Sequence, residues 1–341
     1  MKVAVVILNW NGEAMLRRFL PSVIEHTISE EVEVVIADNG STDGSCKLVE
    51  EEFPQVKLIR LTENYGFAEG YNRALRLVES EYVVLLNNDV EVTEGWIDRM
   101  IEYMDKNQDV GACQPKLLSE RNRRKFEYAG AAGGFIDRYG YPFCRGRVFE
   151  TVEEDNGQYD NVQNVFWASG AAMLIRKSLY EEVGGLDGSF FAHCEEVDLC
   201  WRLLSRGYKI VCLPFSKVYH VGAATLKKES PRKTYLNFRN NRLMLYKNLP
   251  EKELGYIMRV RLLLDVVAAF VFLLQGNGAA FIAVFKALRD FSRMKSDYAD
   301  ARNENMSKTV CNAPEGRYNF CLPWQSKGKG KHLYSELQAK L

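Results

Sequence analysis

The sequence predicts an α/β protein in which a mostly parallel sheet is flanked by helices. Four short apolar runs, rich in β-branched residues, alternate with three segments of helical spacing over about the first 90 residues. This alternation predicts parallel strands joined by right-handed crossover helices. The composition is that of a folded protein, because 47% of the 341 residues are hydrophobic and 26% are charged. At roughly 150 residues per domain, the length indicates about two domains, or one large domain with an appendage.

The first elements follow one another in a regular order. Strands are expected at 2–8, 32–37, 56–61 and 82–86, because short apolar runs are typical of buried parallel strands. Helices are expected at 13–27, around 48–53 and at 67–78, where apolar side chains recur every three or four residues. Ligands of such sheets lie beyond the carboxyl ends of the strands. Polar clusters stand at three of these ends, namely Asn9-Trp10-Asn11, Asp38-Asn39 and Asn88-Asp89.

The middle of the chain is less regular. Residues 120–164 are polar and rich in glycine pairs, and we expect an irregular insertion that faces the substrate. Beyond it, a strand is expected at 165–175, a helix at 195–205 that ends near Gly207, and a further strand at 209–213.

Several functional classes are disfavoured. No strand end carries Gly-x-Gly-x-x-Gly or Gly-Lys-Ser/Thr, which argues against a dinucleotide dehydrogenase and a P-loop NTPase. The formal net charge of zero disfavours a nucleic-acid binder with a globally basic surface. The eight cysteines form no Cys-x-x-Cys pair, so we expect reduced thiols in a cytosolic protein. The first residues run directly into a strand, and no secretory signal is expected.

Five motifs in register resemble those of family 2 glycosyltransferases of the GT-A fold. They are VVILNWNG (5–12), IADNGSTDGS (36–45), NYGFAEGYNRAL (64–75), LLNNDVEV (85–92) and VGGLDGSFFAHCEEVDLCWRLLSRGYKI (183–210), followed by His220. Within the family, the chain looks most like the bacterial rhamnosyltransferase-like branch that builds surface polysaccharides. The resemblance implies a catalytic domain over residues 1–230, about two thirds of the chain.

The resemblance also implies the reaction. A sugar would pass with inversion from a nucleotide-diphosphate sugar, dTDP-rhamnose or a UDP-sugar, to a hydroxyl of a surface-polysaccharide or lipid-linked glycan acceptor. Such a transfer needs a grip on the nucleotide, neutralisation of the leaving diphosphate by Mg²⁺ or Mn²⁺, and a base for the acceptor hydroxyl.

The first four motifs would bind the nucleotide sugar. The matching residues are Leu8, Asn9, Trp10, Asp38, Asn64, Gly66, Phe67, Asn72 and Asn88. Asp38 would accept hydrogen bonds from the pyrimidine or the ribose, although an acid before a helix can also be held by the helix dipole. Trp10 could equally be a packing residue, and Asn72 an exposed helical amide. Gly66 and Gly70 would permit close backbone approach to the nucleotide.

The metal site departs from the family pattern. The usual Asp-x-Asp is replaced by Asn87-Asn88-Asp89, which leaves one carboxylate. An amide oxygen can bind Mg²⁺ or Mn²⁺ but brings no charge, so the affinity for metal stays open. Asp89 and His220 are the expected ligands, although a lone histidine after a strand can also be structural.

The last motif would supply the base and the acceptor site. Glu196 stands where the family base lies, and Glu195 is its rival. Burial and neighbouring carboxylates should lift the pKa of the base toward neutrality, whereas the alternative is acids favoured by the dipole of a helix start. The acceptor-binding candidates are Trp167, Gly170, His193 and Asp198. Trp167 could instead fill the core, His193 could be structural, and Asp198 could pair with Arg202.

Charge divides the chain. Residues 1–230 carry 26 basic and 36 acidic side chains, whereas residues 231–341 carry 19 and 9. In the basic part, the uncharged stretch 266–285 is interrupted at 275–278, so two short apolar helices on a membrane fit better than one span. We expect a helical region over 231–300 that contacts the inner leaflet through 259–295, then a basic tail over 301–341. The protein would be cytoplasmic and peripheral at the inner face of the cytoplasmic membrane.

Other interpretations remain open at this stage. The apolar hairpin could pack on the catalytic domain or form a dimer interface. A sugar nucleotidyltransferase shares the α/β layout, but it predicts a Gly-rich Lys/Arg signature that Asn9-Trp10-Asn11-Gly12 lacks. The missing metal carboxylate suggests a third alternative, a degenerate protein that binds a sugar nucleotide without turnover.

Overall fold

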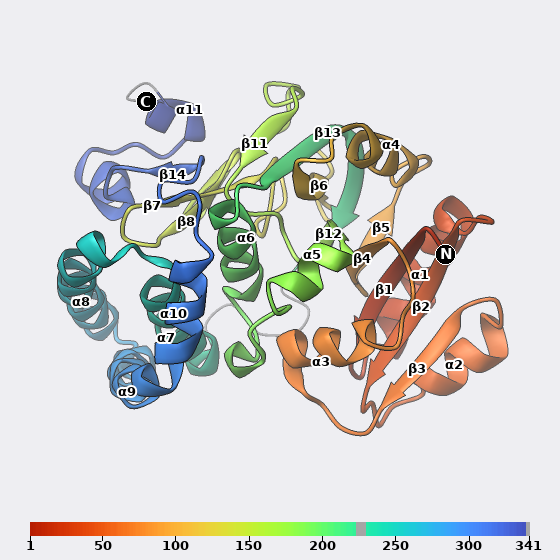
Figure 1. Cartoon of the computed structure of the whole chain (residues 1–341), viewed down its shortest axis with the longest axis horizontal. Coiled ribbons are helices and arrows are strands. Elements are labelled where there is room, and N and C mark those ends of the chain that lie inside the picture. The colour runs from red at the N-terminus through yellow and green to blue at the C-terminus, as the bar shows by residue number, and fades with distance from the viewer. Residues whose placement is uncertain (223–229, 339–341) are drawn as a thin grey trace.

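The computed structural model describes residues 1–222 and 230–338, and its core is one large mixed sheet (Figure 1). The strand order is β11-β13-β6-β12-β4-β1-β2-β3, and β5 pairs with β13. The strands are β1 (Val3–Asn9), β2 (Val32–Asn39), β3 (Lys57–Leu61), β4 (Tyr82–Asn87), β5 (Val90–Val92), β6 (Val110–Ser119), β11 (Gln163–Val165), β12 (Ala172–Arg176) and β13 (Lys209–His220). Strands β1 to β4 pair in parallel, which confirms the predicted alternation.

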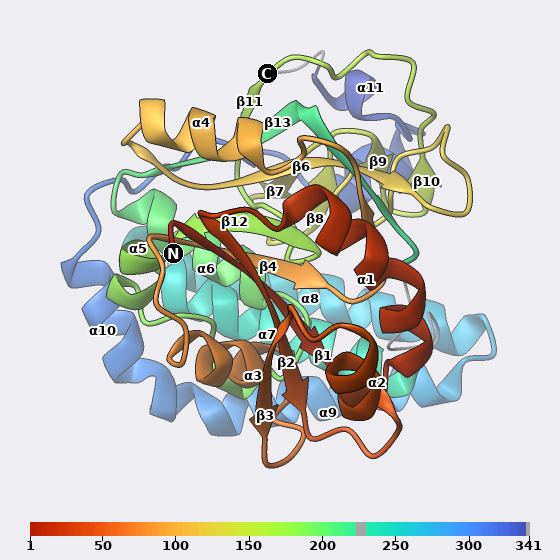
Figure 2. The same cartoon turned by 90° about the vertical axis from the view of Figure 1, so that its right-hand side faces the viewer.

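Helices cover both faces of this sheet because both faces are apolar. Side chains of β1 alternate between two buried clusters, with Val5 beside Leu20 on one face and Val6 beside Tyr71 on the other. The helices are α1 (Glu13–Thr27), α2 (Ser45–Glu52), α3 (Gly66–Leu75), α4 (Asp98–Lys106), α5 (Lys177–Glu182) and α6 (Glu195–Ser205). Helices α1, α2 and α4 contribute to the first cluster, and α3, α5 and α6 contribute to the second; Figure 2 shows the layers from the side.

The strand expected at 165–175 is two strands. Strand β11 pairs with β13, whereas β12 lies antiparallel between β4 and β6. A turn separates them, in which the amide of Ala172 donates to the carbonyl of Ser169. The chain therefore crosses from one edge of the sheet to its middle, which the continuous apolar pattern did not indicate.

We expected the insertion at 120–164 to be irregular, but it carries a small second sheet. Its strands are β7 (Gly134–Asp137), β8 (Pro142–Cys144), β9 (Arg147–Val148) and β10 (Thr151–Val152), joined by β14 (Arg317–Tyr318) from the end of the chain. Gly140 and Gly146 make the tight turns possible, because both have a positive φ that few other residues adopt. The strands are too short to show an alternating pattern in the sequence.

The region predicted to be helical, residues 231–300, contains α7 (Pro231–Asn248), α8 (Glu251–Leu274) and α9 (Gly278–Met294). The residues expected to form a basic tail, 301–341, also carry helices, namely most of α10 (Ala299–Ser307) and α11 (Tyr334–Gln338). The expected interruption separates α8 from α9, and Asn277 caps α9 by accepting from the amide of Ala280. Helix α7 contacts α6, the helix of the last motif, and β14 ties the end of the chain to the insertion (Figure 1).

None of the helices within 1–222 and 230–338 combines the length and apolar character that a membrane span requires.

Candidate active site

A row of polar side chains runs along the carboxyl ends of the central strands. The amide nitrogen of Asn88, after β4, donates to Oδ1 of Asn9 on β1 over 2.8 Å. The amide nitrogen of Asn9 lies 3.4 Å from Oδ1 of Asp38 on β2, and Oδ2 of Asp38 accepts from the amide of Ser41 over 3.0 Å. A Cβ at Gly12 would lie 2.2 Å from Oδ1 of Asn9, so only glycine leaves room for the Asn9 side chain in this row.

This row fixes the orientation of the residues expected to bind the nucleotide. Asn9 and Asp38 are buried, so each hydrogen bond offsets the cost of removing a polar group from water. Trp10 is 47% exposed at the same edge, so it is not a core packing residue. Leu8 precedes Trp10 on β1, is partly buried, and lies against Gly70 of helix α3. The sequence prediction of a polar edge formed by β1, β2 and β4 is confirmed by this arrangement.

A buried histidine between two carboxylates lies beside the row. Nε2 of His220, at the end of β13, is 3.0 Å from Oδ1 of Asp89, and its Nδ1 is 3.4 Å from Oε1 of Glu127. Burial lowers the pKa of His220, but the charges of Glu127 and Asp89 outweigh it and raise the pKa to about 10. Burial raises the pKa of Asp89, but the His220 charge and hydrogen bond outweigh it, so the pKa is lowered overall.

These residues are chemically suited to a divalent cation, although they do not form a complete cage. Among the residues that the structure describes, no group of three or more His, Cys, Asp or Glu side chains is arranged to hold a metal. Asp89 offers a carboxylate, which Mg²⁺ and Mn²⁺ both accept, and His220 offers an imidazole, a ligand that fits a transition metal such as Mn²⁺ better than Mg²⁺. A carboxylate on the far nitrogen of a histidine, as Glu127 is here, is the usual support of a metal-binding imidazole. The remaining ligands would have to come from the substrate or water.

Two glutamates begin helix α6 with free carboxylate oxygens. Oε2 of Glu195 and Oε2 of Glu196 are both buried and have no hydrogen-bond partner. Burial raises the pKa of each carboxyl, and the charge of Glu196 raises the pKa of Glu195 further. These directions agree with what a base in this motif requires. Gly170 lies against Glu196, since a Cβ there would be 3.8 Å from that of the glutamate.

The loop before α6 is held in an unusual backbone conformation. Phe191, His193 and Cys194 have φ values of 64°, 75° and 70°, in the left-handed region that side chains other than glycine rarely adopt. Each such residue costs about 1–3 kcal/mol and persists only where its surroundings hold it. The His193 ring is half-buried; burial and the nearby Lys233 lower its pKa to about 4, so it is neutral at pH 7. Its Nε2 has no hydrogen-bond partner.

The third motif is joined to this loop. The carbonyl of Phe191 accepts from the amides of Phe67 and Ala68 at the start of α3. A Cβ at Gly66 would lie 2.5 Å from the Phe191 ring, so the contact that requires glycine here is with protein, whereas we expected it to be with the nucleotide. Oδ1 of Asn64 accepts from the Gly66 amide over 2.9 Å. These contacts join the loop before α6 to the start of α3.

Three expected site residues are engaged elsewhere. Asn72 bonds to Tyr180 and to the backbone of Leu186 through its amide group. Trp167 is 3% exposed, and its ring nitrogen donates to the carbonyl of Phe135, so it fills the core. Trp167 follows the structural alternative that the sequence left open, whereas Asn72 is partly buried and is not the exposed helical amide of its alternative.

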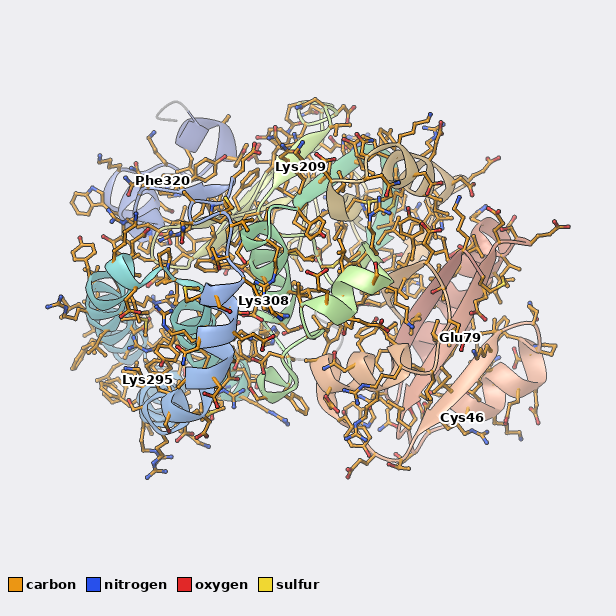
Figure 3. The ribbon with its side chains drawn as sticks, viewed as in Figure 1. Cys46, Glu79, Lys209, Lys295, Lys308 and Phe320 are labelled. Atoms are coloured by element: carbon orange, nitrogen blue, oxygen red, sulfur yellow. The ribbon has the colours of Figure 1, made fainter. Side chains whose placement is uncertain are left out.

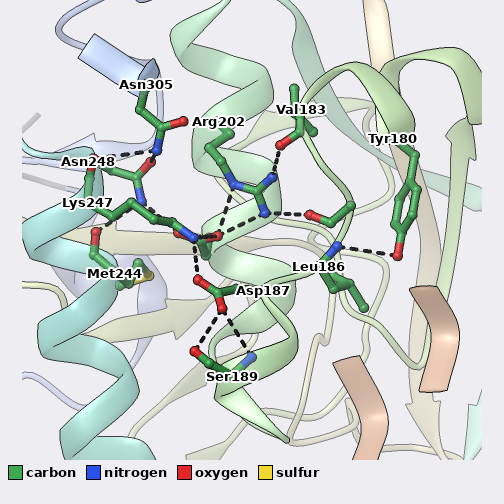
Figure 4. Close-up of polar contacts among 12 residues, drawn as sticks. Tyr180, Val183, Leu186, Asp187, Ser189, Arg202, Met244, Lys247, Asn248 and Asn305 are labelled. Carbon is green, nitrogen blue, oxygen red and sulfur yellow. Dashed lines mark hydrogen bonds and ion pairs between the residues drawn. The ribbon is translucent and has the colours of Figure 1, made fainter. Parts of the chain in front are cut away.

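Asp198 is the third of these residues, and its partners Arg202, Lys247 and Asn248 are labelled in Figure 4. It is fully buried and lies within hydrogen-bond distance of Arg202 (2.9 Å), Lys247 (2.8 Å) and Asn248 (2.7 Å). It therefore links α6 to α7 and has no oxygen open to an acceptor. The predicted pairing with Arg202 is confirmed, and the acceptor-binding assignment is corrected for this reason.

Sequence reasoning missed several residues of the site. Glu127 lies in the insertion that the sequence left unassigned, and Asn240 lies in the C-terminal region. The sequence placed Asn39 in the polar cluster at the end of β2 but assigned it no role. In the structure its side-chain nitrogen donates to Oδ1 of Asn64 over 3.2 Å and holds that loop. No local pattern marks Glu127 and Asn240, because the partners named for them are 47 or more residues away in the sequence.

Comparisons with known proteins identify the family. Residues 4–184 match the family model described as Glycosyl transferase family 2. The chain belongs to this family.

This glycosyltransferase is 28% identical over 232 residues to N-acetylglucosaminyl-diphospho-decaprenol L-rhamnosyltransferase of Mycobacterium tuberculosis (strain ATCC 25618 / H37Rv), covering 63% of the chain and 75% of that protein. The crystal structure of S. aureus TarS 1-349 in complex with UDP-GlcNAc matches with a TM-score of 0.56 at 17% identity, over 90% of this chain and 89% of that chain. The mannosyltransferase PcManGT from Pyrobaculum calidifontis, solved with GDP-Man and Mn2+, matches with a TM-score of 0.52 at 15% identity, over 91% and 86%. The likeness establishes the GT-A fold that the motifs implied.

Replacing Glu195 or Glu196 by glutamine should stabilise the glycosyltransferase at pH 8. In the unfolded chain a glutamate titrates near 4.3, whereas both carboxyls have raised pKa values when folded. Their ionisation therefore costs the folded state free energy as the pH rises from about 4.3 through the folded pKa values. Thermal unfolding should give a higher Tm for each variant at pH 8, and the gain should shrink toward pH 4.

The matched control is Glu79→Gln, at the exposed glutamate labelled in Figure 3, which should show no pH-dependent gain. A Tm at pH 8 that is unchanged or lower in both active-site variants would contradict the prediction.

Proposed function

We propose that the protein transfers a sugar with inversion from a nucleotide-diphosphate sugar, either dTDP-rhamnose or a UDP-sugar, to a hydroxyl of a surface-polysaccharide or lipid-linked glycan acceptor. The observation that carries the proposal is the pair of glutamates at the start of α6. Each has a buried carboxylate oxygen without a hydrogen-bond partner, and the pKa of each carboxyl is raised. The relative from Mycobacterium tuberculosis, whose name specifies an L-rhamnosyl donor group and a lipid diphosphate acceptor, supports the substrate class.

In this mechanism the chain's own residues bind the donor and move one proton. Asp38 and Asn9 hold the nucleoside through the polar row, with Trp10 and Leu8 against the base. Glu196 takes the proton of the acceptor hydroxyl on its free oxygen, and the hydroxyl oxygen attacks the anomeric carbon from the face opposite the diphosphate. Glu195 is the rival base, and the charge of Glu196 raises its pKa beyond the effect of burial. Gly170 and His193 would border the acceptor.

We further propose that Asp89 and His220 hold Mg²⁺ or Mn²⁺. A bound cation supplies charge that stabilises the leaving diphosphate. The buried carboxylate–imidazole pair and the Glu127 support behind it are the observations in favour.

Glu196→Gln should lower kcat about 10²–10⁴-fold while leaving the KM for the donor nearly unchanged, because general-base catalysis contributes a factor of that size. Transfer from dTDP-rhamnose or UDP-sugars to a lipid-linked glycan acceptor measures it, with Glu195→Gln assayed in parallel. The acid limb of the wild-type profile should lie above pH 4.3, because both carboxyl pKa values are raised. A loss confined to Glu195→Gln would move the base to Glu195, and full activity in both variants would refute the role of the pair.

Removal of divalent cations should abolish transfer, and added Mn²⁺ should restore it. Asp89→Asn should raise the Mn²⁺ concentration needed for half-maximal rate about tenfold or more, since it removes the only carboxylate of the pair. Turnover that is unimpaired in EDTA would contradict the metal proposal and leave the base proposal standing.

One rival function has a specific observation in its favour. The replacement of a carboxylate by Asn87 or Asn88 favours a protein that binds the sugar nucleotide without turning it over. Thermal shift with a panel of donors detects binding in either case. Binding of a donor without transfer or hydrolysis, with Mn²⁺ present, would establish the rival.

A second part of the proposal concerns the hairpin of α8 and α9. Large apolar side chains are exposed along one face of each helix, namely Leu263, Val267, Phe270 and Leu274 on α8 and Ile282 and Phe285 on α9. Their spacing of three and four residues places them in line. Exposed basic residues lie on the same faces, with Arg259 one turn before Leu263 and Lys286, Arg289 and Arg293 following Ile282. We propose that this face lies on the anionic inner leaflet, which makes the enzyme cytoplasmic and peripheral.

The double substitution Leu263→Glu with Leu274→Glu should weaken binding to vesicles that contain anionic lipid by about tenfold or more, because it removes two apolar anchors and adds like charge. Co-sedimentation measures it. The side chains are 67% and 88% exposed, so the fold should persist. The control is Leu77→Glu, at a leucine that is 58% exposed near the end of α3. Unchanged vesicle binding would refute the membrane contact, and loss of a dimer would indicate an interface instead.

A further inference from the structure

Helix α7 makes hydrogen bonds to the loop that precedes Glu195 and Glu196. The side-chain nitrogen of Asn240, which is fully buried, lies 2.9 Å from the carbonyl oxygen of Phe190, 2.9 Å from that of Ala192 and 2.8 Å from that of His193. Its two N–H bonds are therefore shared among three acceptors. These carbonyls flank or belong to the left-handed residues Phe191, His193 and Cys194. The Phe190 carbonyl also accepts from the amide of Ala192.

The residue before Asn240 makes a second contact to the same loop. Nη2 of Arg239 donates to the carbonyls of Ser189 and Phe190, over 2.8 and 3.2 Å. Its Nη1 lies 3.5 Å from the hydroxyl of Tyr235, which donates to Asp290 of α9 over 3.0 Å. Arg239 and Asn240 of α7 therefore contact four carbonyls of the loop, those of Ser189, Phe190, Ala192 and His193. Through Tyr235, this turn of α7 is also bonded to α9.

We propose that Asn240 is a positioning residue for Glu195 and Glu196. It stabilises the left-handed conformation at Phe191, His193 and Cys194, and this conformation sets the direction in which α6 begins. The proposal rests on the proposed function, since it takes the two glutamates as the catalytic pair. Without the amide, the loop would relax toward ordinary backbone angles, because the carbonyls of Ala192 and His193 would lose the Asn240 donor that offsets the strain, whereas Phe190 would keep Arg239.

The chain offers a matched control on the same helix. Asn241 is also buried, and its amide nitrogen donates to the carbonyl of Gly140 in the insertion rather than to the catalytic loop. Its oxygen accepts from Arg261. Loss of either asparagine removes buried hydrogen bonds, so both substitutions should lower the Tm. Only the loss of Asn240 should disturb the glutamates.

The test compares Asn240→Ala and the isosteric Asn240→Asp with Asn241→Ala in the full chain. Both Asn240 variants should lose about 100-fold in kcat, the effect typical of a misplaced catalytic group, with donor KM within about twofold. The acid limb of the pH–rate profile should move to lower pH in these variants, because contact with water would reduce the effect of burial that raises the pKa of the two glutamates. Asn241→Ala should keep kcat and the pH profile of the wild type. Equal kcat losses in all three, or an unshifted profile in the Asn240 variants, would overturn the proposal.

A second measurement does not depend on catalysis. The amides of Phe67 and Ala68 donate to Phe191 in the loop, so their hydrogen exchange reports on its conformation. Exchange should be faster in Asn240→Asp and unchanged in Asn241→Ala. If the wild type transfers no sugar, the proposed function fails, and this measurement alone decides whether Asn240 holds the loop; equal exchange in wild type and Asn240→Asp would show that it does not.

Discussion

The site depends on a buried ion-pair network centred on Asp198 (Figure 4). A fully buried carboxylate is tolerated only when it is paired, and Asp198 contacts Arg202, Lys247 and Asn248. Arg202 in turn donates to the carbonyls of Val183 and Gly185, and Lys247 pairs with Asp187 over 2.7 Å. The network therefore connects helix α6, the loop before it and the C-terminal helix α7. Glu195 and Glu196 begin α6, so this network bears on their position.

The network also explains how three acids in one helical turn acquire different properties. Asp198 faces cations and amides on α7, whereas Glu195 and Glu196 have buried oxygens without a hydrogen-bond partner, and burial raises their pKa values. Adjacent carboxyls with different surroundings can divide the tasks of structure and proton transfer. Sequence position gives all three the same helix-dipole environment, so it is the packing of α7 that separates them.

The C-terminal region is consequently joined to the catalytic region by specific polar contacts as well as apolar ones. Helix α7 supplies Asn240 to the loop and Lys247 to the network, and β14 extends the small sheet of the insertion. The basic character of this region has two uses in the structure. Some of its cations neutralise buried carboxylates of the acidic part, and others line the exposed apolar face of α8 and α9.

The sequence by itself determined the parallel sheet, the family motifs and the polar clusters at the strand ends, because each strand, motif and cluster is formed by residues close together in the chain. It also located the glutamates and the break between α8 and α9. Only the tertiary structure placed Glu127 behind His220 and Asn240 on the loop before α6, and only it showed that Asp198 and Trp167 are enclosed. These contacts join residues 32 to 93 positions apart, and their energetic value comes from burial, which no local pattern records.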